Sequence, residues 1–135
     1  MTVARSASAA DVRRWAIEAA RAADAKQADH VVILDVNEVL GITDYFVICS
    51  ARNDRLVKTV AETIGERMKD IEGPKPLRIE GLAEAHWVLM DYADFVVHVF
   101  STDARGFYDL ERLWRDVPRV EWEDTGSGVR RAVSD

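Results

Sequence analysis

The chain has 135 residues, of which 48% are hydrophobic and 31% charged, with 24 acidic side chains against 18 basic ones and a net charge of −6. This composition is typical of one globular domain, and it disfavours a protein that holds nucleic acid through an extended basic surface. No apolar run approaches the ~20 residues that cross a membrane, and the N-terminus has no apolar stretch typical of a secretory signal. A single cysteine excludes an internal disulfide, so we expect a cytoplasmic protein.

The first half of the chain predicts two helices separated by two strands. Residues 1–8 are expected to be disordered, with a capping box of Ser8 and Asp11 opening the first helix. Short β-branched runs predict the strands, and a Gly-Pro pair stops the second helix. The expected elements are a helix from Ser8 to about Gln27, strands over 30–36 and 45–49 joined through a turn at Gly41, and a helix capped by Asn53 or Asp54 that ends before Gly73.

The second half predicts a short strand over 77–79, a hairpin over 86–100 and a last helix that opens at Thr102 or Asp103 and ends before Pro118. The order α-β-β-α-β-β-β-α predicts an α/β (α+β) domain with a mixed sheet of about five strands flanked by helices. We expect this single domain to cover residues 9–117. Residues 118–135 are then a C-terminal extension that is largely disordered.

The hairpin sequence HWVLMDYADFVVHVF raises a question about charge. If Tyr92 and Ala93 form a two-residue turn, Asp91 faces Asp94 across it, and like charges directly opposite destabilise a sheet. One hairpin face is then apolar and suited to the core. That face carries His86, Val88, Met90, Phe95, Val97 and Val99, and the other carries Trp87, Leu89, Asp91, Asp94, Val96 and His98.

Two interpretations of the second face stay open at this point. The two acids can simply end their strands and cap turn N–H groups, with Trp87 buried and His98 hydrogen-bonded beneath it. Alternatively, Trp87 is a partly exposed anchor for a partner, and Asp91 and Asp94 await its cationic side chains. Tryptophan is typical of such interface anchors.

Motifs for catalysis or metal binding are absent from the sequence. Cys49 lies in an apolar strand and predicts an inert buried thiol, and the three histidines lack metal-ligand spacing. Asp35 and Asp44 could hold Mg²⁺ and nucleotide phosphates, but the chain has no glycine-rich phosphate loop beside them. We therefore expect no catalytic residues, no metal site, no cofactor and no enzyme activity.

Several segments together resemble the ribosomal silencing factor family, also called the Iojap family. They span roughly residues 10–117 in the expected order, and their combination is specific although each piece alone is weak. The matching pieces are ITDYFVI at 42–48 with Ser50, Arg55 and Val57, Glu80-Gly81, WVLMD at 87–91, DFVVHVF at 94–100, and the R-x-FY-x-LE-x-LW pattern at 105–114.

The resemblance implies a translation repressor that binds large-subunit ribosomal protein fourteen and sterically prevents the ribosomal subunits from joining when nutrients are scarce. It implies a nucleotidyltransferase-like fold without the catalytic Gly-Ser and Asp-x-Asp signature. The acidic charge predicts little or no direct rRNA contact, and the absence of a long apolar run predicts no contact with a membrane. The implied contact surface includes Trp87 and Tyr92, and the same motif carries over Asp91 and Asp94. With Leu89 and His98, these six residues are the expected partner-binding site.

The family commonly has glycine where this chain has Ala93, and a positive φ there would strain alanine by ~1 kcal/mol. Three rival functions remain. The chain could assist assembly of the large subunit, act as a nucleotidyltransferase-like enzyme through Asp35 and Asp44, or form a homo-oligomer through an exposed Trp87 or Trp122. A homodimer off the ribosome is compatible with the silencing function.

Overall fold

The computed structural model describes residues 7–108, 112 and 114–122. In this part of the chain the predicted order of elements is confirmed, with one additional helical turn before Gly41. The elements are α1 (Ala9–Ala25), β1 (Asp29–Asp35), α2 (Asn37–Leu40), β2 (Tyr45–Ala51), α3 (Asp54–Asp70), β3 (Arg78–Glu80), β4 (Trp87–Asp91), β5 (Phe95–Ser101) and α4 (Thr102–Tyr108).

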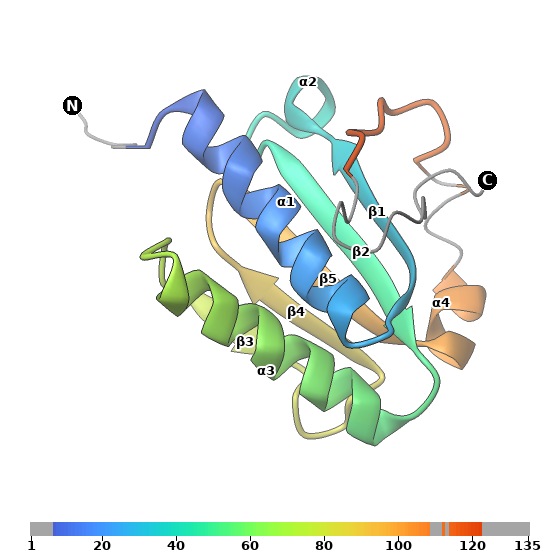
Figure 1. Cartoon of the computed structure of the whole chain (residues 1–135). Coiled ribbons are helices and arrows are strands. Elements are labelled where there is room, and N and C mark those ends of the chain that lie inside the picture. Colours follow the sequence, from blue (N-terminus) through green and yellow to red (C-terminus); the bar gives the residue numbers. More distant parts are fainter. Residues whose placement is uncertain (1–6, 109–111, 113, 123–135) are drawn as a thin grey trace.

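The strands form one five-stranded sheet in the order β1-β2-β5-β4-β3. The neighbours β2 and β5 are parallel and the other pairs are antiparallel, so the sheet is mixed as predicted. Helices α1 and α3 contact each other and lie over the same face of the sheet, in front of it in Figure 1. This α/β single domain is the fold class that the sequence predicted.

The two long helices begin where their capping residues predict. The Ser8 hydroxyl accepts from the Asp11 N–H at 3.1 Å, and the Asn53 side chain accepts from the Leu56 N–H at 2.8 Å. Gly41 has a φ of +75° and ends α2, as expected for a residue in the left-handed region at a helix C-terminus. These local signals position the helices at the correct points of the chain.

Apolar side chains fill both faces of the sheet. The main core lies under α1 and α3 and contains the predicted apolar hairpin face, including Val88, Met90 and Phe95. A smaller cluster lies on the opposite face, where Trp114 and Val117 pack against buried residues of β1, β2 and β5. The buried members of this smaller cluster are Val32, Leu34, Val36, Ile48 and Phe100.

The C-terminal part of the domain differs from the prediction. Helix α4 is described over Thr102–Tyr108, and the predicted helix continues through residues 109–111 and 113, which lie outside the described residues. The Ser101 hydroxyl, and not Thr102 or Asp103, accepts from the Ala104 N–H at the start of this helix, at 3.2 Å.

Residues 118–122 cover the outer edge of β1, although the sequence placed them in a disordered extension. The Val120 N–H donates to the Ile33 carbonyl at 2.9 Å, and the Trp122 indole N–H donates to the Val31 carbonyl at 3.3 Å. Trp122 is only 3% exposed, so the idea of an exposed anchor at this residue is wrong. The packed domain continues through Trp122, and the rest of the predicted extension lies outside the described residues.

Candidate functional site: the hairpin of β4 and β5

The hairpin turn lies one residue further along the chain than predicted. The Tyr92 N–H donates to the Phe95 carbonyl at 3.0 Å, so Ala93 and Asp94 form the turn. Asp91 therefore pairs with Val96 and not with Asp94. Each β4 residue therefore faces a β5 residue two positions further along the chain than predicted. Because the shift is an even number of residues, every side chain stays on its predicted face. The division into two faces was therefore right, whereas the predicted register was wrong.

The two carboxylates do not face each other. One oxygen of Asp91 accepts from the Ala93 N–H at 2.9 Å, and the other lies 3.7 Å from the guanidinium Nε of Arg78 on β3. The Asp94 carbonyl accepts from the Asp44 N–H at 2.8 Å, which links the turn to the segment before β2. The repulsion inferred from the sequence is absent, and Asp91 caps the turn as the first interpretation proposed.

Trp87 is held in a defined orientation by residues of β5. It pairs across the strands with Phe100 instead of His98, and the two ring centroids are 4.9 Å apart. Its indole N–H nevertheless donates to Nδ1 of His98 at 3.1 Å, because His98 is the diagonal neighbour on the same face. Trp87 is half-buried, so part of the ring remains accessible on the surface of the sheet.

The buried His98 side chain packs beneath the Trp87 ring and accepts its indole hydrogen bond. Its side chain is 5% exposed, and the ring of Phe46 packs edge-on against it at 4.7 Å. Burial lowers the pKa of His98 to about 4, which keeps the imidazole neutral at physiological pH. A neutral imidazole can leave Nδ1 free to accept the Trp87 hydrogen bond. Burial also means that His98 contacts Trp87 and not solvent.

Tyr92 lies on the opposite face from Trp87, which corrects its assignment to the same surface. Its ring stacks on Phe95 at 4.8 Å with an interplanar angle of 10°, and the residue is 3% exposed. Burial raises the pKa of its phenol to about 12. Tyr92 therefore belongs to the core side of the hairpin.

The residues accessible around Trp87 form a strip across β3, β4 and β5, called here the Trp87 face. Its apolar members Leu89 and Val96 are half-buried, and Arg78 and Glu80 of β3 are exposed beside them. The strip consists of Trp87, Leu89, Asp91, Val96, Arg78 and Glu80, which the sheet register places on one side. It is continuous with the smaller core cluster, of which Trp87 is a partly buried member.

Gly81 positions Trp87 and was not recognised as a functional residue, although it belongs to the segments that carry the family resemblance. It has a φ of +87°, and a Cβ added there would lie 2.1 Å from the Trp87 carbonyl oxygen. Only glycine permits both this backbone angle and this close approach. The sequence signal was the Glu80-Gly81 pair just before the strand.

Arg105 is a second residue whose role the sequence pattern did not indicate. It is 6% exposed, and its guanidinium donates to the His30 carbonyl at 2.7 Å. The β1–β2 pairing is irregular between Asp29 and Val32, and Arg105 binds the backbone at this irregularity. Arg105 therefore stabilises the contact between α4 and β1.

The other candidate groups form local structural contacts. The Asn37 amide donates to the Asp44 carboxylate at 2.6 Å, and the Asn37 N–H donates to the Asp35 carboxylate at 3.2 Å. Cys49 is fully buried, and burial raises the pKa of its thiol to about 12. Among the described residues, no group of three or more histidine, cysteine or acidic side chains could hold a metal ion.

A search of the described residues for a helix long and apolar enough to cross a membrane finds none. Apolar segments of this chain are used instead as strands and as the inner faces of α1 and α3.

Comparisons with known proteins agree on one family. The family model described as "Ribosomal silencing factor during starvation" matches residues 9–134. Ribosomal silencing factor RsfS of Bacillus subtilis strain 168 is 42% identical over 103 residues, which cover 76% of this chain and 86% of that protein. The mitochondrial Iojap-related protein of Arabidopsis thaliana is 32% identical over 95 residues, covering 68% of this chain and 51% of the plant protein.

Solved structures agree with the sequence matches. A crystal structure from Bacillus halodurans superposes with a TM-score of 0.70 at 36% identity, covering 81% of this chain and 98% of the other. An X-ray structure from Chromobacterium violaceum gives a TM-score of 0.71 at 27% identity, covering 81% and 88%. The family model spans nearly the whole described domain, Trp87 face included, and the chain therefore belongs to the ribosomal silencing factor family.

Proposed function

We propose that this protein binds large-subunit ribosomal protein fourteen through the Trp87 face and thereby blocks joining of the two ribosomal subunits. Translation would be repressed in the cytoplasm under nutrient limitation. The observation that carries the proposal is the half-buried Trp87, which is oriented by the hydrogen bond to His98 and accessible beside Leu89 and Val96. A pre-oriented aromatic ring loses little entropy on binding and is suited to anchor an interface.

Each of the six expected site residues has a distinct role in this proposal. Trp87 and Leu89 supply apolar contact, and Asp91 supplies negative charge at the edge of the strip. His98 acts through Trp87, because it is buried beneath the indole. Tyr92 and Asp94 act on the shape of the hairpin tip, Tyr92 from the core side and Asp94 from the turn.

Charge favours a protein partner over rRNA. The net charge of −6 opposes close contact with many phosphates, whereas a basic ribosomal protein would be attracted to it. On the Trp87 face, Asp91 and Glu80 provide carboxylates, and Arg78 lies within 3.3 Å of the Glu80 carboxylate. A cationic side chain of the partner could compete for these acids when the interface forms.

The proposed activity is steric and requires no catalysis and no cofactor. The carboxylates of Asp35 and Asp44, which were the candidates for an enzyme, are both hydrogen-bonded through Asn37. These contacts give both carboxylates a local structural role at the α2 turn. Because the Asp35 and Asp44 carboxylates hold this turn together, they support a regulatory protein over a nucleotidyltransferase.

The test is sucrose-gradient sedimentation of purified large subunits with the wild-type protein and with Trp87→Ala. The wild type should co-sediment with large subunits and reduce the fraction of joined ribosomes when small subunits are added. Trp87→Ala should do neither. Trp15→Ala is the matched control, because Trp15 is a half-buried tryptophan on α1, on the other side of the sheet.

The proposal fails if Trp87→Ala folds and binds large subunits like the wild type. A homodimer that pairs two Trp87 faces would compete with ribosome binding. Sedimentation velocity of the free protein over a range of concentrations measures this competition, and Trp87→Ala should be more monomeric than the wild type if such a dimer forms.

A further inference from the structure

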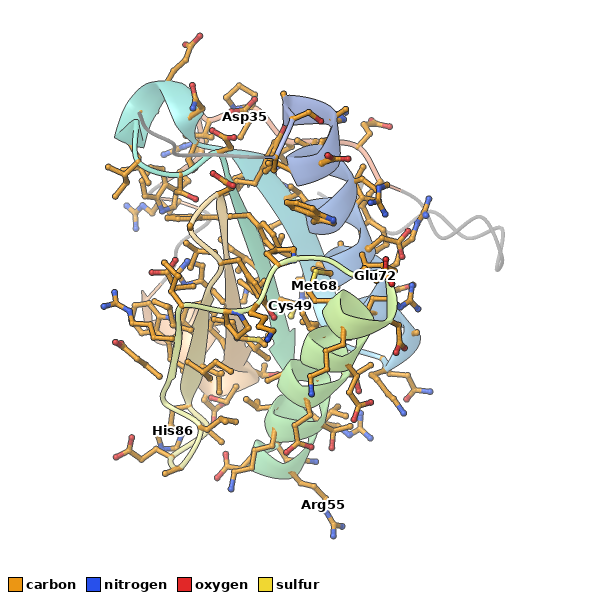
Figure 2. The ribbon with its side chains drawn as sticks, turned by 90° about the vertical axis from the view of Figure 1, so that its left-hand side faces the viewer. Asp35, Cys49, Arg55, Met68, Glu72 and His86 are labelled. Carbon is orange, nitrogen blue, oxygen red and sulfur yellow. The ribbon has the colours of Figure 1, made fainter. Side chains whose placement is uncertain are left out.

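A groove of about 710 Å³ lies behind β4, on the opposite side of the strand from the Trp87 face. It is bounded by the C-terminal half of α3, the segment 72–76 and β3. In Figure 2 the chain leaves α3 near Glu72, crosses over and runs back toward His86, and the lining residues 72–76, Ile79 and Leu82 come from this stretch of the chain. Its volume is in the range typical of small-molecule sites.

The floor of the groove is apolar. Met90 of β4 and Leu82 line it together with Ile79, a β3 residue that is 42% exposed. Pro74 and Pro76 form part of one wall, and proline restricts backbone motion in the segment that follows α3. An apolar floor with a stiff wall favours a site that is already formed before a ligand binds.

Gly65 keeps the groove open. It lies in the middle of α3, where glycine is less favourable than alanine, and a Cβ added there would meet only the Met90 terminal methyl at 3.8 Å. The Cβ of a larger side chain would therefore fit at position 65 without a clash, and the rest of that side chain would extend into the groove. The absence of a side chain is not required by the packing of the helix.

Tyr92 provides the one buried polar group in the lining. Its hydroxyl is buried and has no hydrogen-bond partner among the described residues, and Tyr92 lines the groove. A buried hydroxyl without a partner is unfavourable, and buried polar side-chain atoms nearly always have a hydrogen-bond partner, so an acceptor on a bound molecule would relieve this cost. Because burial raises the pKa of this phenol to about 12, it stays protonated and able to donate.

The rim carries charges of both signs. Glu62, Glu66 and Glu72 lie at the rim together with Lys69 and Lys75. Mixed charges give no strong preference for an anion or a cation, so an uncharged ligand fits this rim.

We propose that the groove binds a small, uncharged, mostly apolar molecule that carries one hydrogen-bond acceptor for the Tyr92 hydroxyl. The groove and the Trp87 face lie on opposite sides of β4, and the groove shares with the proposed partner-binding residues only Tyr92, which lines the groove and shapes the hairpin tip from the core side. The inference does not depend on the proposed function, and binding at the groove can be measured without ribosomes.

The test uses two neutral fluorescent probes on the full chain. Nile red is apolar and carries a carbonyl acceptor, whereas N-phenyl-1-naphthylamine is apolar and lacks a carbonyl. Both should bind the wild type saturably with one site per chain. Gly65→Leu should weaken both probes at least about tenfold by filling the groove, whereas Lys58→Leu, on an exposed part of α3 outside the groove, should stay within about twofold.

The hydroxyl is tested separately. Tyr92→Phe should weaken Nile red about fivefold, the effect of one net hydrogen bond, and leave N-phenyl-1-naphthylamine unchanged. If Gly65→Leu folds poorly, Ile79→Gln replaces it, because Ile79 is partly exposed and its change removes apolar lining without disturbing the core.

Two outcomes would overturn the proposal. One is binding of both probes to Gly65→Leu or Ile79→Gln with the wild-type affinity. The other is a wild-type dimer that excludes the probes until it dissociates and that Gly65→Leu disrupts, because a second copy of the chain would then be the occupant of the groove.

Discussion

Backbone angles at single residues determine how the hairpin is built. Ala93 has a φ of +73°, in the left-handed region that the family's glycine at this position favours. The resemblance identified Ala93 as the position where a positive φ would strain alanine, and the sequence placed this residue second in the turn instead of first. The alternation of apolar residues could not correct the error, because both registers put the same side chains on the same faces.

Gly81→Ala should destabilise the protein strongly, by at least about 2 kcal/mol. The added methyl would overlap the Trp87 carbonyl, and the φ of +87° adds strain. Chemical denaturation with urea measures the loss. Gly41→Ala separates the two causes, because Gly41 has a φ of +75° with no atom within 4 Å of the added methyl, and it should cost only about 1 kcal/mol.

Gly106→Ala completes the series. Gly106 has an ordinary helical φ and open space around it, so this change should be neutral or stabilise by up to about 1 kcal/mol. Equal losses for Gly81→Ala and Gly41→Ala would show that the contact with the Trp87 carbonyl contributes nothing.

His98 should make the protein less stable in mild acid. The pKa of its imidazole is about 4 in the folded state against 6.5 in the unfolded chain, because burial disfavours the charged form. Below pH 6.5 the unfolded state binds a proton that the folded state does not, so stability falls as the pH decreases toward 4. The total loss is about 3 kcal/mol.

Urea denaturation of the wild type and His98→Gln between pH 4 and 7.5 isolates this contribution. Glutamine can accept from the Trp87 indole and does not titrate, and the other two histidines are common to both proteins. The wild type should lose stability more steeply than the variant below pH 6.5. Parallel pH profiles would contradict the role assigned to the His98 imidazole.

At the level of elements, local signals were sufficient for the helices and insufficient for the sheet edges. Ser8 and Asn53 define the starts of α1 and α3 through contacts within three residues of themselves. Pairing of residues 118–122 with β1 joins positions more than 80 residues apart, as in the Val120 and Ile33 contact. Composition and periodicity carry no information about such a distant partner, and residues 118–122 were therefore grouped with the polar segment that follows them.

Trp122→Ala should destabilise the protein by about 3 kcal/mol, because it removes a buried ring and its hydrogen bond to the Val31 carbonyl. Arg119→Ala is the matched control. The Arg119 side chain is exposed while its backbone pairs with Leu34, so truncating it should change stability by less than about 0.5 kcal/mol. A thermal or urea unfolding curve distinguishes the two. Equal effects would mean that Trp122 adds nothing to the domain.

For the whole molecule, β4 links two different surfaces. Trp87 and Leu89 point to the proposed ribosomal face, whereas Met90 and Tyr92 point to the groove and the core. The sequence indicated the family and proposed Trp87 as a site residue, but it gave no sign of the groove, because Gly65, Tyr92 and the segment after α3 come together only in the folded chain. Residues near one another in sequence could be grouped from the sequence, and those brought together by the fold could not.

The net charge of −6 predicts how salt affects binding to the proposed partner. Association with isolated ribosomal protein fourteen should slow about tenfold or more as NaCl rises from about 50 to 500 mM, because salt screens long-range attraction between an acidic and a basic protein.

Asp91→Asn and Glu62→Gln each change the net charge by the same amount, from −6 to −5. Asp91 lies on the Trp87 face and Glu62 on α3 across the sheet, so stopped-flow measurements should give a weaker salt dependence for Asp91→Asn than for Glu62→Gln. Identical salt dependence for the two variants would mean that only total charge matters, and the partner would then approach another face of the molecule.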